Sequence, residues 1–337
     1  MRGTLSDDLA VLGPLDGELI GGNGTLLVQY GGPRGALSVV PWVHEHRSAL
    51  LSAVEEYGAV RVRGVVDDPA SLEEVTRVLG GELLAYTERT TPRTSVRGNV
   101  YTSTEYPPAQ TIPQHHELSY ARVVPRLLFF ACTVPAESGG ATPLADGAAV
   151  LARLPEDLVA RFREQGVLYT RAYRVGMGLT WQEAFQTEDR AEVEDYCVHN
   201  GLEWEWCGDG ELRTRSHRPA VVTDPGSGRE VWFNQAHLFH VSNLPDDVGA
   251  ALAAMFEERD YPRHAYHGDG SPITEAELAL IRRAFVDCSF ETPWHSGDLM
   301  IVGNLLVSHG RRPYTGQRRV LVTMAGAVEI GGVDDHR

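Results

Sequence analysis

A continuous apolar segment at residues 125–135, PRLLFFACTVP, constrains the fold more than any other feature of this sequence. It is shorter than the roughly 18 apolar residues that a membrane helix needs, so it does not predict a transmembrane span. A short apolar run between turn-forming residues such as proline is typical of a strand that is buried on both faces. We therefore predict a fully buried strand at this position.

Several other segments predict strands near both ends of the chain and helices between them. Strand patterns occur at 59–65, in the hairpin-like segment 212–235, at 298–310 and at 318–330. Helical spacing occurs at 44–57, 68–79, 181–201, 246–258 and 274–286. This order fits neither an alternating βαβ fold nor a helical bundle, and it predicts a mainly β protein with helical insertions. We expect a double-stranded β-helix, or jelly-roll, core.

The domain prediction is a single domain over residues 1–337, with helical insertions at approximately 145–210 and 244–290. Glycine and proline are spread along the chain rather than concentrated in one linker, which favours one compact unit with many turns.

Charge and cysteine content exclude several classes of function. The net charge of −16 disfavours binding to nucleic acid or to anionic membranes. The start of the chain lacks a secretion-signal pattern, so we expect a cytoplasmic protein. The four cysteines share no CxxC spacing and are expected to be reduced thiols. A bound metal would therefore be held by histidine and carboxylate side chains.

The segment IPQHHELSY provides the first candidate metal ligands. His115 and Glu117 are two residues apart, so on an extended strand both side chains would point to the same side. A further histidine would complete a facial triad of two histidines and one carboxylate, the arrangement of non-haem iron(II) oxygenases. His116 would point to the opposite face, and we interpret it as structural.

Two downstream segments offer the groups that such a site would need. His309 follows an apolar strand, and Arg318 with Arg319 opens the next strand. An arginine inside a barrel is costly unless it meets an anion, and 2-oxoglutarate presents a suitable carboxylate. One arginine of the pair must face inward and the other outward. In GGATP, Thr142 could donate its hydroxyl to the same carboxylate.

The ordered combination of these motifs resembles the clavaminate synthase-like and taurine dioxygenase superfamily of iron(II)- and 2-oxoglutarate-dependent oxygenases. The resemblance is closest to the branch of amino-acid hydroxylases found in antibiotic biosynthesis, and it extends from about Val39 to Ala327. It implies a jelly-roll fold and a dependence on Fe(II), on 2-oxoglutarate as co-substrate and on O2. The implied reaction is hydroxylation of an unactivated C–H bond.

Transferred position by position, the resemblance implies that His115, Glu117 and His309 bind the iron and form the catalytic centre. It implies that Arg319 binds the distal carboxylate of 2-oxoglutarate with the help of Thr142. Arg318, the neighbour of Arg319, is then expected to face the opposite way.

Two comparisons with the superfamily narrow the reaction. Sulfonate-oxidising relatives have a second arginine four residues after the 2-oxoglutarate arginine, where this chain has Thr323. A sulfonate substrate is therefore not expected. Halogenating relatives have a small residue in place of the metal-binding carboxylate, whereas this chain has Glu117. Hydroxylation or a related oxidation is expected instead.

The predicted substrate is a small molecule, an amino acid or an amino-acid derivative, either free or tethered to a carrier protein. Substrate contacts are expected near the metal segment and the WFNQAHLFH segment, at Thr102, Ser103, Ser119, Tyr120, Asn234, Gln235 and His237. Arg93 and Arg97 are further candidates for binding a carboxylate.

Other outcomes remain open from the sequence. The same cofactor chemistry can end in desaturation, cyclisation or epimerisation, because the pose of the substrate decides its fate. A barrel that binds metal without turnover is the alternative outside enzymes, and succinate formation would discriminate between the two. The sequence does not indicate an oligomeric state.

Overall fold

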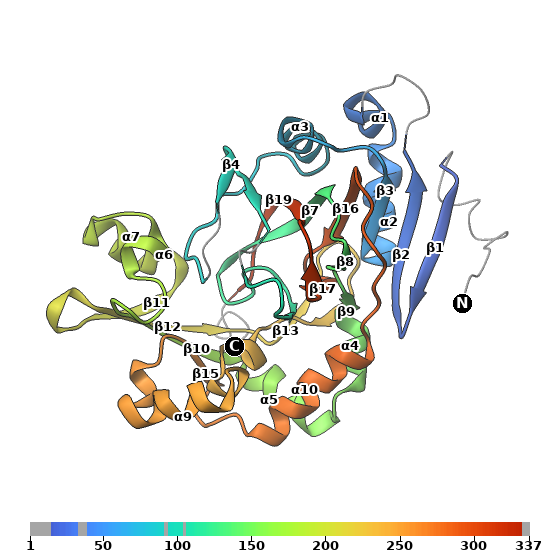
Figure 1. Cartoon of the computed structure of the whole chain (residues 1–337). Coiled ribbons are helices and arrows are strands. Elements are labelled where there is room, and N and C mark those ends of the chain that lie inside the picture. The colour runs from blue at the N-terminus through green and yellow to red at the C-terminus, as the bar shows by residue number, and fades with distance from the viewer. Residues whose placement is uncertain (1–14, 33–38, 91–93, 104–105, 332–337) are drawn as a thin grey trace.

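The large sheet at the centre of the molecule contains the predicted apolar strand (Figure 1). The computed structural model describes residues 15–32, 39–90, 94–103 and 106–331. In spatial order, the strands of the sheet are β1 (Gly17–Gly22), β2 (Thr25–Gly31), β3 (Ala59–Arg63), β16 (Asp298–Gly303), β7 (Val123–Val134), β19 (Arg319–Glu329), β5 (Val100–Thr102) and β4 (Ser95–Arg97). Neighbouring strands are antiparallel except for the parallel pair β2 and β3.

Strand β7 is buried on both faces, as the apolar run predicts. Leu128 and Phe130 belong to the core on one side of the sheet, and Leu127 and Phe129 to the core on the other. Pro125 lies inside the strand, at a place where β7 pairs with β19 but not yet with β16. A proline, which lacks an N–H donor, is tolerated where one side of the strand is unpaired.

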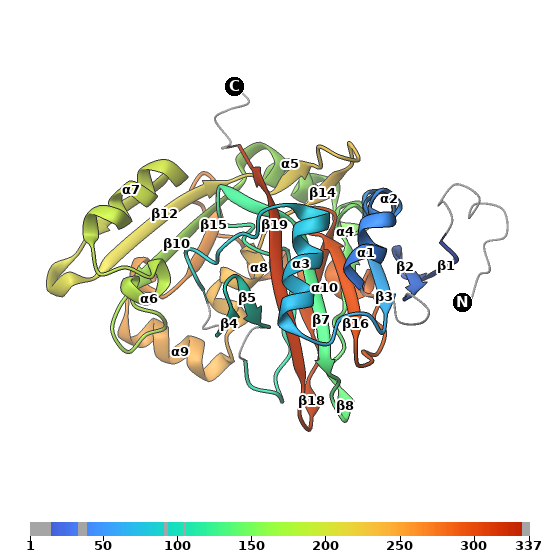
Figure 2. The ribbon, with the colours of Figure 1, turned by 90° about the horizontal axis from the view of Figure 1, so that it is seen from above.

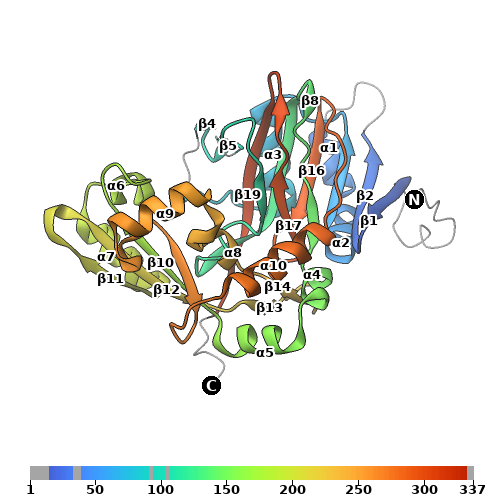
Figure 3. The same cartoon turned by 60° about the horizontal axis from the view of Figure 1, so that its bottom comes forward.

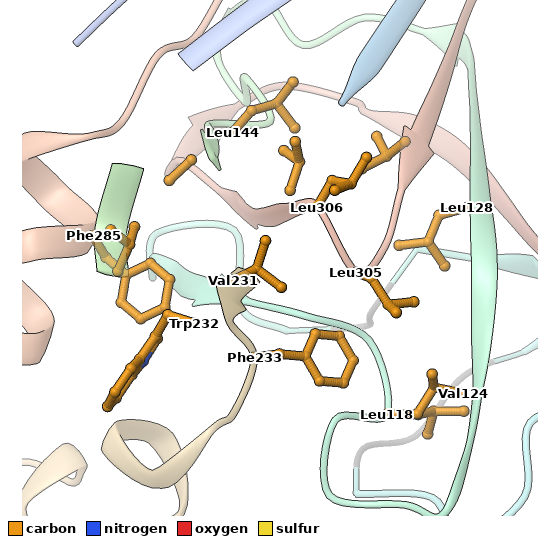
Figure 4. Close-up of a cluster of buried hydrophobic side chains, with 14 of the residues drawn as sticks. Leu118, Val124, Leu128, Leu144, Val231, Trp232, Phe233, Phe285, Leu305 and Leu306 are labelled. Atoms are coloured by element: carbon orange, nitrogen blue, oxygen red, sulfur yellow. The ribbon is translucent and has the colours of Figure 1, made fainter. Parts of the chain in front are cut away.

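A three-stranded sheet faces the large sheet and completes the double-stranded β-helix core. Its strands, in order, are β6 (Ile112–His115), β17 (Val307–Arg311) and β9 (Leu144–Asp146). The ring of Phe130 on β7 lies 5.1 Å from the ring of His309 on β17. Figure 4 shows apolar side chains of this core, with those of Phe233 and Leu305 lying between those of Leu306 and Leu118. The predicted fold class is confirmed.

Three helices cover the outer face of the large sheet: α1 (Val39–Glu45), α2 (Arg47–Tyr57) and α3 (Pro69–Gly80). Figure 2 shows α3 lying along β7, β16 and β19. Helix α3 begins where the Asp68 carboxylate accepts hydrogen bonds from the amides of Ala70 and Ser71, and Pro69 follows at the first helical position. Apolar residues of these helices and of the sheet form a second core.

The chain between β9 and β16 is only partly helical, which corrects the predicted insertions. Its helices are α4 (Gly147–Arg153), α5 (Glu156–Gln165), α6 (Trp181–Phe185), α7 (Arg190–Asn200), α8 (Ala236–Phe239), α9 (Asp246–Met255) and α10 (Glu275–Asp287). The same region forms a four-stranded antiparallel sheet, in the order β11 (Leu202–Trp206), β12 (Leu212–Arg218), β10 (Val167–Tyr173) and β15 (His264–His267). Figure 3 shows this sheet beside the jelly roll, with α9 packed next to it.

Buried and less buried residues alternate along β12, as expected for a half-buried strand. The predicted hairpin is shorter than 212–235 and consists of β13 (Val221–Thr223) and β14 (Glu230–Trp232). A further small pair joins β18 (Tyr314–Thr315) and β8 (Ser138–Gly139). Within the described ranges, none of the helices combines the length and apolar character that a membrane crossing requires.

Truncation of Phe129 tests the packing between β7 and the covering helices. Its side chain is fully buried, and a Cβ atom placed on Gly80 of α3 would lie 3.5 Å from its ring. We expect Phe129→Ala to lower the free energy of unfolding by about 3–5 kcal/mol because it leaves a cavity. Urea denaturation followed by circular dichroism measures the change.

Val123→Ala, at an exposed position of the same strand, is the matched control and should change stability by less than about 0.5 kcal/mol. Equal effects of the two substitutions would contradict the assignment of Phe129 to the core beneath α3.

Candidate active site

Three predicted ligand side chains lie together at the junction of β6 and β17. His115 is the last residue of β6 and pairs in register with His309 on β17. One ligand atom each of His115, Glu117 and His309 lies within 4.8 Å of the others. The Glu117 carboxylate is 3.8 Å from Nε2 of His309, and the two imidazole rings are 4.4 Å apart. Two imidazoles and one carboxylate at this spacing can hold a divalent metal as a facial triad.

The orientation of His115 suits metal binding. Its Nδ1 lies 2.9 Å from the carbonyl oxygen of Pro113, so Nδ1 bears the proton and donates a hydrogen bond. The neutral ring then has its lone pair on Nε2, which is the state that a metal requires. Both histidines and the carboxylate are enclosed by protein, and the chemistry of this donor set fits iron(II).

Glu117 reaches the triad from a turn rather than from the extended strand that its spacing predicts. Strand β6 ends at His115, and Glu117 begins a turn whose next residue, Leu118, has a φ of 57°. A left-handed backbone at a buried leucine is costly and persists only where the surroundings hold it. The sequence correctly predicts that His115 and Glu117 converge. The cause is a turn after β6 and not a continuous extended strand.

The side chain of Asn304 holds this turn in place. Its amide oxygen accepts a 2.7 Å hydrogen bond from the Glu117 N–H, and its amide nitrogen donates to the carbonyl oxygens of Glu117 and Pro125. Asn304 lies in the turn between β16 and β17, which leads to His309. One fully buried side chain therefore connects the two ligand segments. Sequence reasoning missed it, although an asparagine in the apolar run IVGNLLV was a usable signal.

His116 faces away from the triad, in agreement with its structural interpretation. Its Nδ1 lies 2.6 Å from the backbone oxygen of Asn304, and its ring packs against Phe233. Burial lowers the pKa of His116 to about 4, so the ring is neutral at physiological pH. The backbone oxygen of His116 accepts a 2.6 Å hydrogen bond from the Gln235 side chain.

A cavity on one side of His115 contains the candidate 2-oxoglutarate groups, and we call it the Arg318 cavity. Its lining comprises Ser103, Ile112, His115, Phe130, Thr142, His309, Gly310, Arg311, Arg318 and Val320. Arg318 donates a 2.9 Å hydrogen bond from Nε to the Gly140 carbonyl oxygen and a 3.4 Å hydrogen bond to the Ser103 hydroxyl. Burial lowers the pKa of Arg318 to about 10, so the guanidinium remains charged at neutral pH.

Thr142 lies in this cavity with its hydroxyl oriented by Trp294. The indole N–H of Trp294 donates a 3.0 Å hydrogen bond to the Thr142 oxygen, which leaves the hydroxyl proton to be donated elsewhere. The GGATP passage brings the backbone close to Arg318. Gly140 has a φ of 70°, and a Cβ there would lie 3.0 Å from the Arg318 side chain.

The prediction that Arg319 faces inward is wrong, because Arg318 occupies that position. Arg319 is exposed at the start of β19, where its backbone pairs with Val134. Side chains alternate along a strand, so Arg318 shares the interior face with Val320 and Val322. Counted from Arg318, the position that corresponds to the sulfonate arginine is Val322 rather than Thr323, and it offers no cation either. Thr323 instead lies 2.6 Å from the Thr76 hydroxyl of α3.

A second cavity lies over the triad, and we call it the Arg263 cavity. Its lining comprises Thr90, Tyr106, Ile112, Pro113, His115, Glu117, Tyr120, Gln235, Leu238, Asn243 and Arg263. Of the predicted substrate contacts, it contains Tyr120 and Gln235. Sequence reasoning missed Arg263 and Asn243, whose segments lie far from the metal motif in the chain.

The other predicted substrate contacts lie elsewhere. Ser103 lines the Arg318 cavity, whereas Thr102 hydrogen-bonds to the backbone of Thr94. Asn234 and His237 are buried and hydrogen-bonded to backbone carbonyl oxygens, of Ala220 and Gln114 respectively. Neither residue lines the Arg263 cavity, and both support the fold beside it.

Two further candidates, Ser119 and Arg97, lie outside both cavities. Ser119 is buried and belongs to the lining of neither cavity. Arg97 pairs with Glu73 at 2.7 Å on the surface, and Arg93 lies outside the described residues.

A jelly roll with two histidines and a carboxylate beside a cavity that contains a half-buried arginine defines the class of non-haem iron oxygenases. The chain belongs to the family described as taurine catabolism dioxygenase TauD, TfdA family, whose model matches residues 35–325. It is accordingly a dioxygenase, and its family uses Fe(II), 2-oxoglutarate and O2.

Individual relatives agree with this membership. The chain is 42% identical to the dapdiamide synthesis protein DdaC of Enterobacter agglomerans over 276 residues, which cover 82% of this chain and 84% of the relative. It is 33% identical to a clavaminate synthase-like protein of Arabidopsis thaliana over 287 residues, 82% of this chain and 83% of the relative.

A solved structure shares the fold. The PvcB protein of Pseudomonas aeruginosa matches with a TM-score of 0.56 and 18% identity, over 98% of this chain and 97% of PvcB. PvcB is described as an Fe, alpha-ketoglutarate dependent oxygenase from an isonitrile synthetic pathway.

Removal of the Asn304 side chain tests its role in positioning Glu117. Asn304→Ala leaves two buried backbone groups of Glu117 without their partner. We expect metal affinity to fall about 10- to 100-fold, as for other groups that orient metal ligands. Titration with Mn(II) under anaerobic conditions, on protein whose fold is verified by circular dichroism, measures the affinity.

Asn200→Ala is the matched control, because its side chain donates one hydrogen bond within α7 and lies away from the triad. Wild-type Mn(II) affinity in folded Asn304→Ala would show that the turn needs no such support.

Proposed function

We propose that this dioxygenase hydroxylates an unactivated C–H bond of an amino acid or amino-acid-derived small molecule. In this proposal His115, Glu117 and His309 hold the iron(II), and Arg318, Thr142 and Ser103 hold 2-oxoglutarate. The observation on which it depends is the placement of this triad between two cavities, each of which contains an arginine.

The Arg318 cavity fits a carboxylate of 2-oxoglutarate. The Arg318 guanidinium donates from Nε to the Gly140 carbonyl oxygen, and its terminal nitrogens are suited to paired hydrogen bonds with a carboxylate. Thr142, which lies just before β9, adds a hydroxyl donor, and the indole N–H of Trp294 fixes the position of its oxygen. His115 and His309 line the same cavity, so a molecule anchored at Arg318 would extend toward the triad.

When bound, iron and 2-oxoglutarate supply the oxidation: O2 and 2-oxoglutarate become succinate and CO2, and one oxygen atom enters the substrate C–H bond. The protein's own contribution is to hold the substrate in the Arg263 cavity and to surround it. Tyr120 and Gln235 form part of the wall there, and both are fixed by hydrogen bonds to the backbone, at Glu88 and His116. A rigid wall favours one C–H bond over its neighbours.

Three observations support a small amino-acid-like substrate and hydroxylation. The Arg263 cavity mixes hydroxyl, amide and guanidinium groups with apolar ones, which suits a polar metabolite. Glu117 occupies the carboxylate position, so chloride would find no vacant ligand site there. The curated relative at 42% identity is named for the synthesis of dapdiamide, and this fits a role in antibiotic-like biosynthesis.

The arginine pair provides a sharp test of the co-substrate site. We expect Arg318→Ala to weaken 2-oxoglutarate binding about 100-fold, because a half-buried cation that meets the carboxylate is lost. Arg319→Ala removes the same charge from an exposed position and should bind 2-oxoglutarate as the wild type does. Titration of the anaerobic iron(II) protein with 2-oxoglutarate, followed by the weak visible charge-transfer band of the chelate, measures both. If Arg319→Ala weakened 2-oxoglutarate binding and Arg318→Ala did not, Arg319 would be the residue that binds the co-substrate.

The reaction itself is tested by product analysis with a panel of amino acids and N-acylated amino acids. A true substrate should yield succinate in equal amount to a product that has gained one oxygen atom, labelled when 18O2 is supplied. Glu117→Ala should abolish both products, because it removes the carboxylate ligand.

A product that has lost two hydrogens would show that the reaction is desaturation or cyclisation and not hydroxylation. An epimer of unchanged mass would show that it is epimerisation. Succinate formation that no panel member stimulates would contradict the proposed substrate class.

A further inference from the structure

Arg263 lies where the Arg263 cavity meets a second, more apolar cleft. It lines both spaces, together with Thr90 and Tyr106. The remainder of the cleft includes apolar side chains of α9 and of the segments around it, among them Met177, Leu179, Leu244, Leu252, Phe256 and Pro262. The Arg263 guanidinium lies over the ring of Phe239, 5.9 Å from its centroid. A cation is thus held where a largely apolar cleft meets the Arg263 cavity.

The guanidinium of Arg263 has no acidic partner among the described residues, where it makes no ion pair or side-chain hydrogen bond. Three arginines that are more deeply buried than Arg263 differ in this respect. Arg171 lies 3.5 Å from the Glu88 carboxylate, and Arg311 donates to three backbone carbonyl oxygens. Arg218 also donates to three carbonyl oxygens. The donors of Arg263 therefore remain for a bound molecule.

The surroundings of Arg263 increase its need for an anion. Burial lowers the pKa of Arg263, and the positive charge of Arg171 acts in the same direction. Tyr106 and Tyr120 oppose these effects, but a neutral phenol compensates a partly buried cation only weakly. A carboxylate, by contrast, matches a guanidinium with two parallel hydrogen bonds.

The two arginines divide the site between two anions. The Arg318 and Arg263 cavities share Ile112 and His115 as common walls, so they meet at the triad. Arg318 faces the co-substrate cavity, which leaves Arg263 as the cation on the substrate side. A molecule anchored at Arg263 would extend past Tyr120 and Gln235 toward Glu117, which line the same cavity.

We infer that Arg263 binds a free carboxylate of the substrate, an inference that rests on the proposed function. The substrate is then a carboxylic acid whose anionic end lies at Arg263, where the apolar cleft meets the cavity, and whose oxidised carbon lies at the triad. An amino acid attached to a carrier through its carboxylate lacks this anion. The geometry thus favours a free amino acid or N-acyl amino acid over a molecule tethered in that way.

The test compares each acid with its methyl ester, in wild type and in Arg263→Gln. The protein is loaded anaerobically with Mn(II) and 2-oxoglutarate, so that binding is measured by calorimetry without turnover. The probes are a panel of amino acids and N-acyl amino acids, each with its methyl ester. We expect acids that bind the wild type to bind about 10- to 100-fold more tightly than their esters. In Arg263→Gln this preference should disappear, and Arg263→Lys should retain part of it.

Arg259→Gln is the matched control. Arg259 is four residues away, exposed and paired with Glu257, so its loss removes the same charge without touching the cavity. It should keep the full preference for acids. Equal binding of acids and esters by the wild type, no binding of any acid, or a preference that persists in Arg263→Gln would each overturn the inference.

The proposed function is checked on the same proteins by a separate signal. The charge-transfer band of iron(II) with 2-oxoglutarate should form in the wild type and in Arg263→Gln alike, because Arg263 lies outside the Arg318 cavity. A normal band with no acid preference would reject the role of Arg263 alone. Absence of the band from the wild type would reject the proposed function and this inference together.

Discussion

The hydrogen bonds of the Asn304 side chain are the interaction on which the candidate site depends. They satisfy the buried N–H and C=O of Glu117 from the turn that leads into β17. The backbone pairing of His115 with His309 sets the distance between the two imidazoles, and Asn304 sets the place of the carboxylate relative to both. A buried amide with every group satisfied resists rearrangement, because each broken bond would leave a polar group without water. The left-handed backbone of Leu118 is tolerated within this support.

Around the triad, charge is distributed in a way that follows from burial. Arg318 and Arg263 each face one of two cavities that meet at His115, whereas Arg311 donates from its two terminal nitrogens to the backbone of the 106–110 segment. Arg311 thereby fixes a loop, and the other two remain available to small anions. A protein with a net charge of −16 would repel anionic molecules over most of its surface. Localised cations inside the site are consistent with a co-substrate and a substrate that both carry carboxylates.

Sequence reasoning was strongest where one residue type in one pattern had one physical meaning. The apolar run of β7 could only be covered on both faces, and the two histidines with Glu117 could be recognised as a ligand set. It was weakest where two answers were equally compatible with the pattern. Both faces of β19 are apolar, with Val320 and Val322 in one core and Leu321 and Ala325 in the other, so polarity could not tell whether Arg318 or Arg319 faces inward.

The sequence by itself determined the class of fold and the types of ligand, because these follow from local periodicity and from the spacing of motifs. The dependence on Fe(II), 2-oxoglutarate and O2 came from the resemblance of those motifs to a known superfamily. Only the tertiary structure decided that Arg318 enters the cavity, that Asn304 holds the Glu117 turn and that Arg263 faces the triad from the substrate side. Each of these depends on contacts between residues far apart in the chain, such as Asn304 with Glu117. The local sequence pattern indicates which face of a helix or strand is apolar. The same pattern does not indicate which distant segment will pack against that face, or which polar groups will be buried away from water.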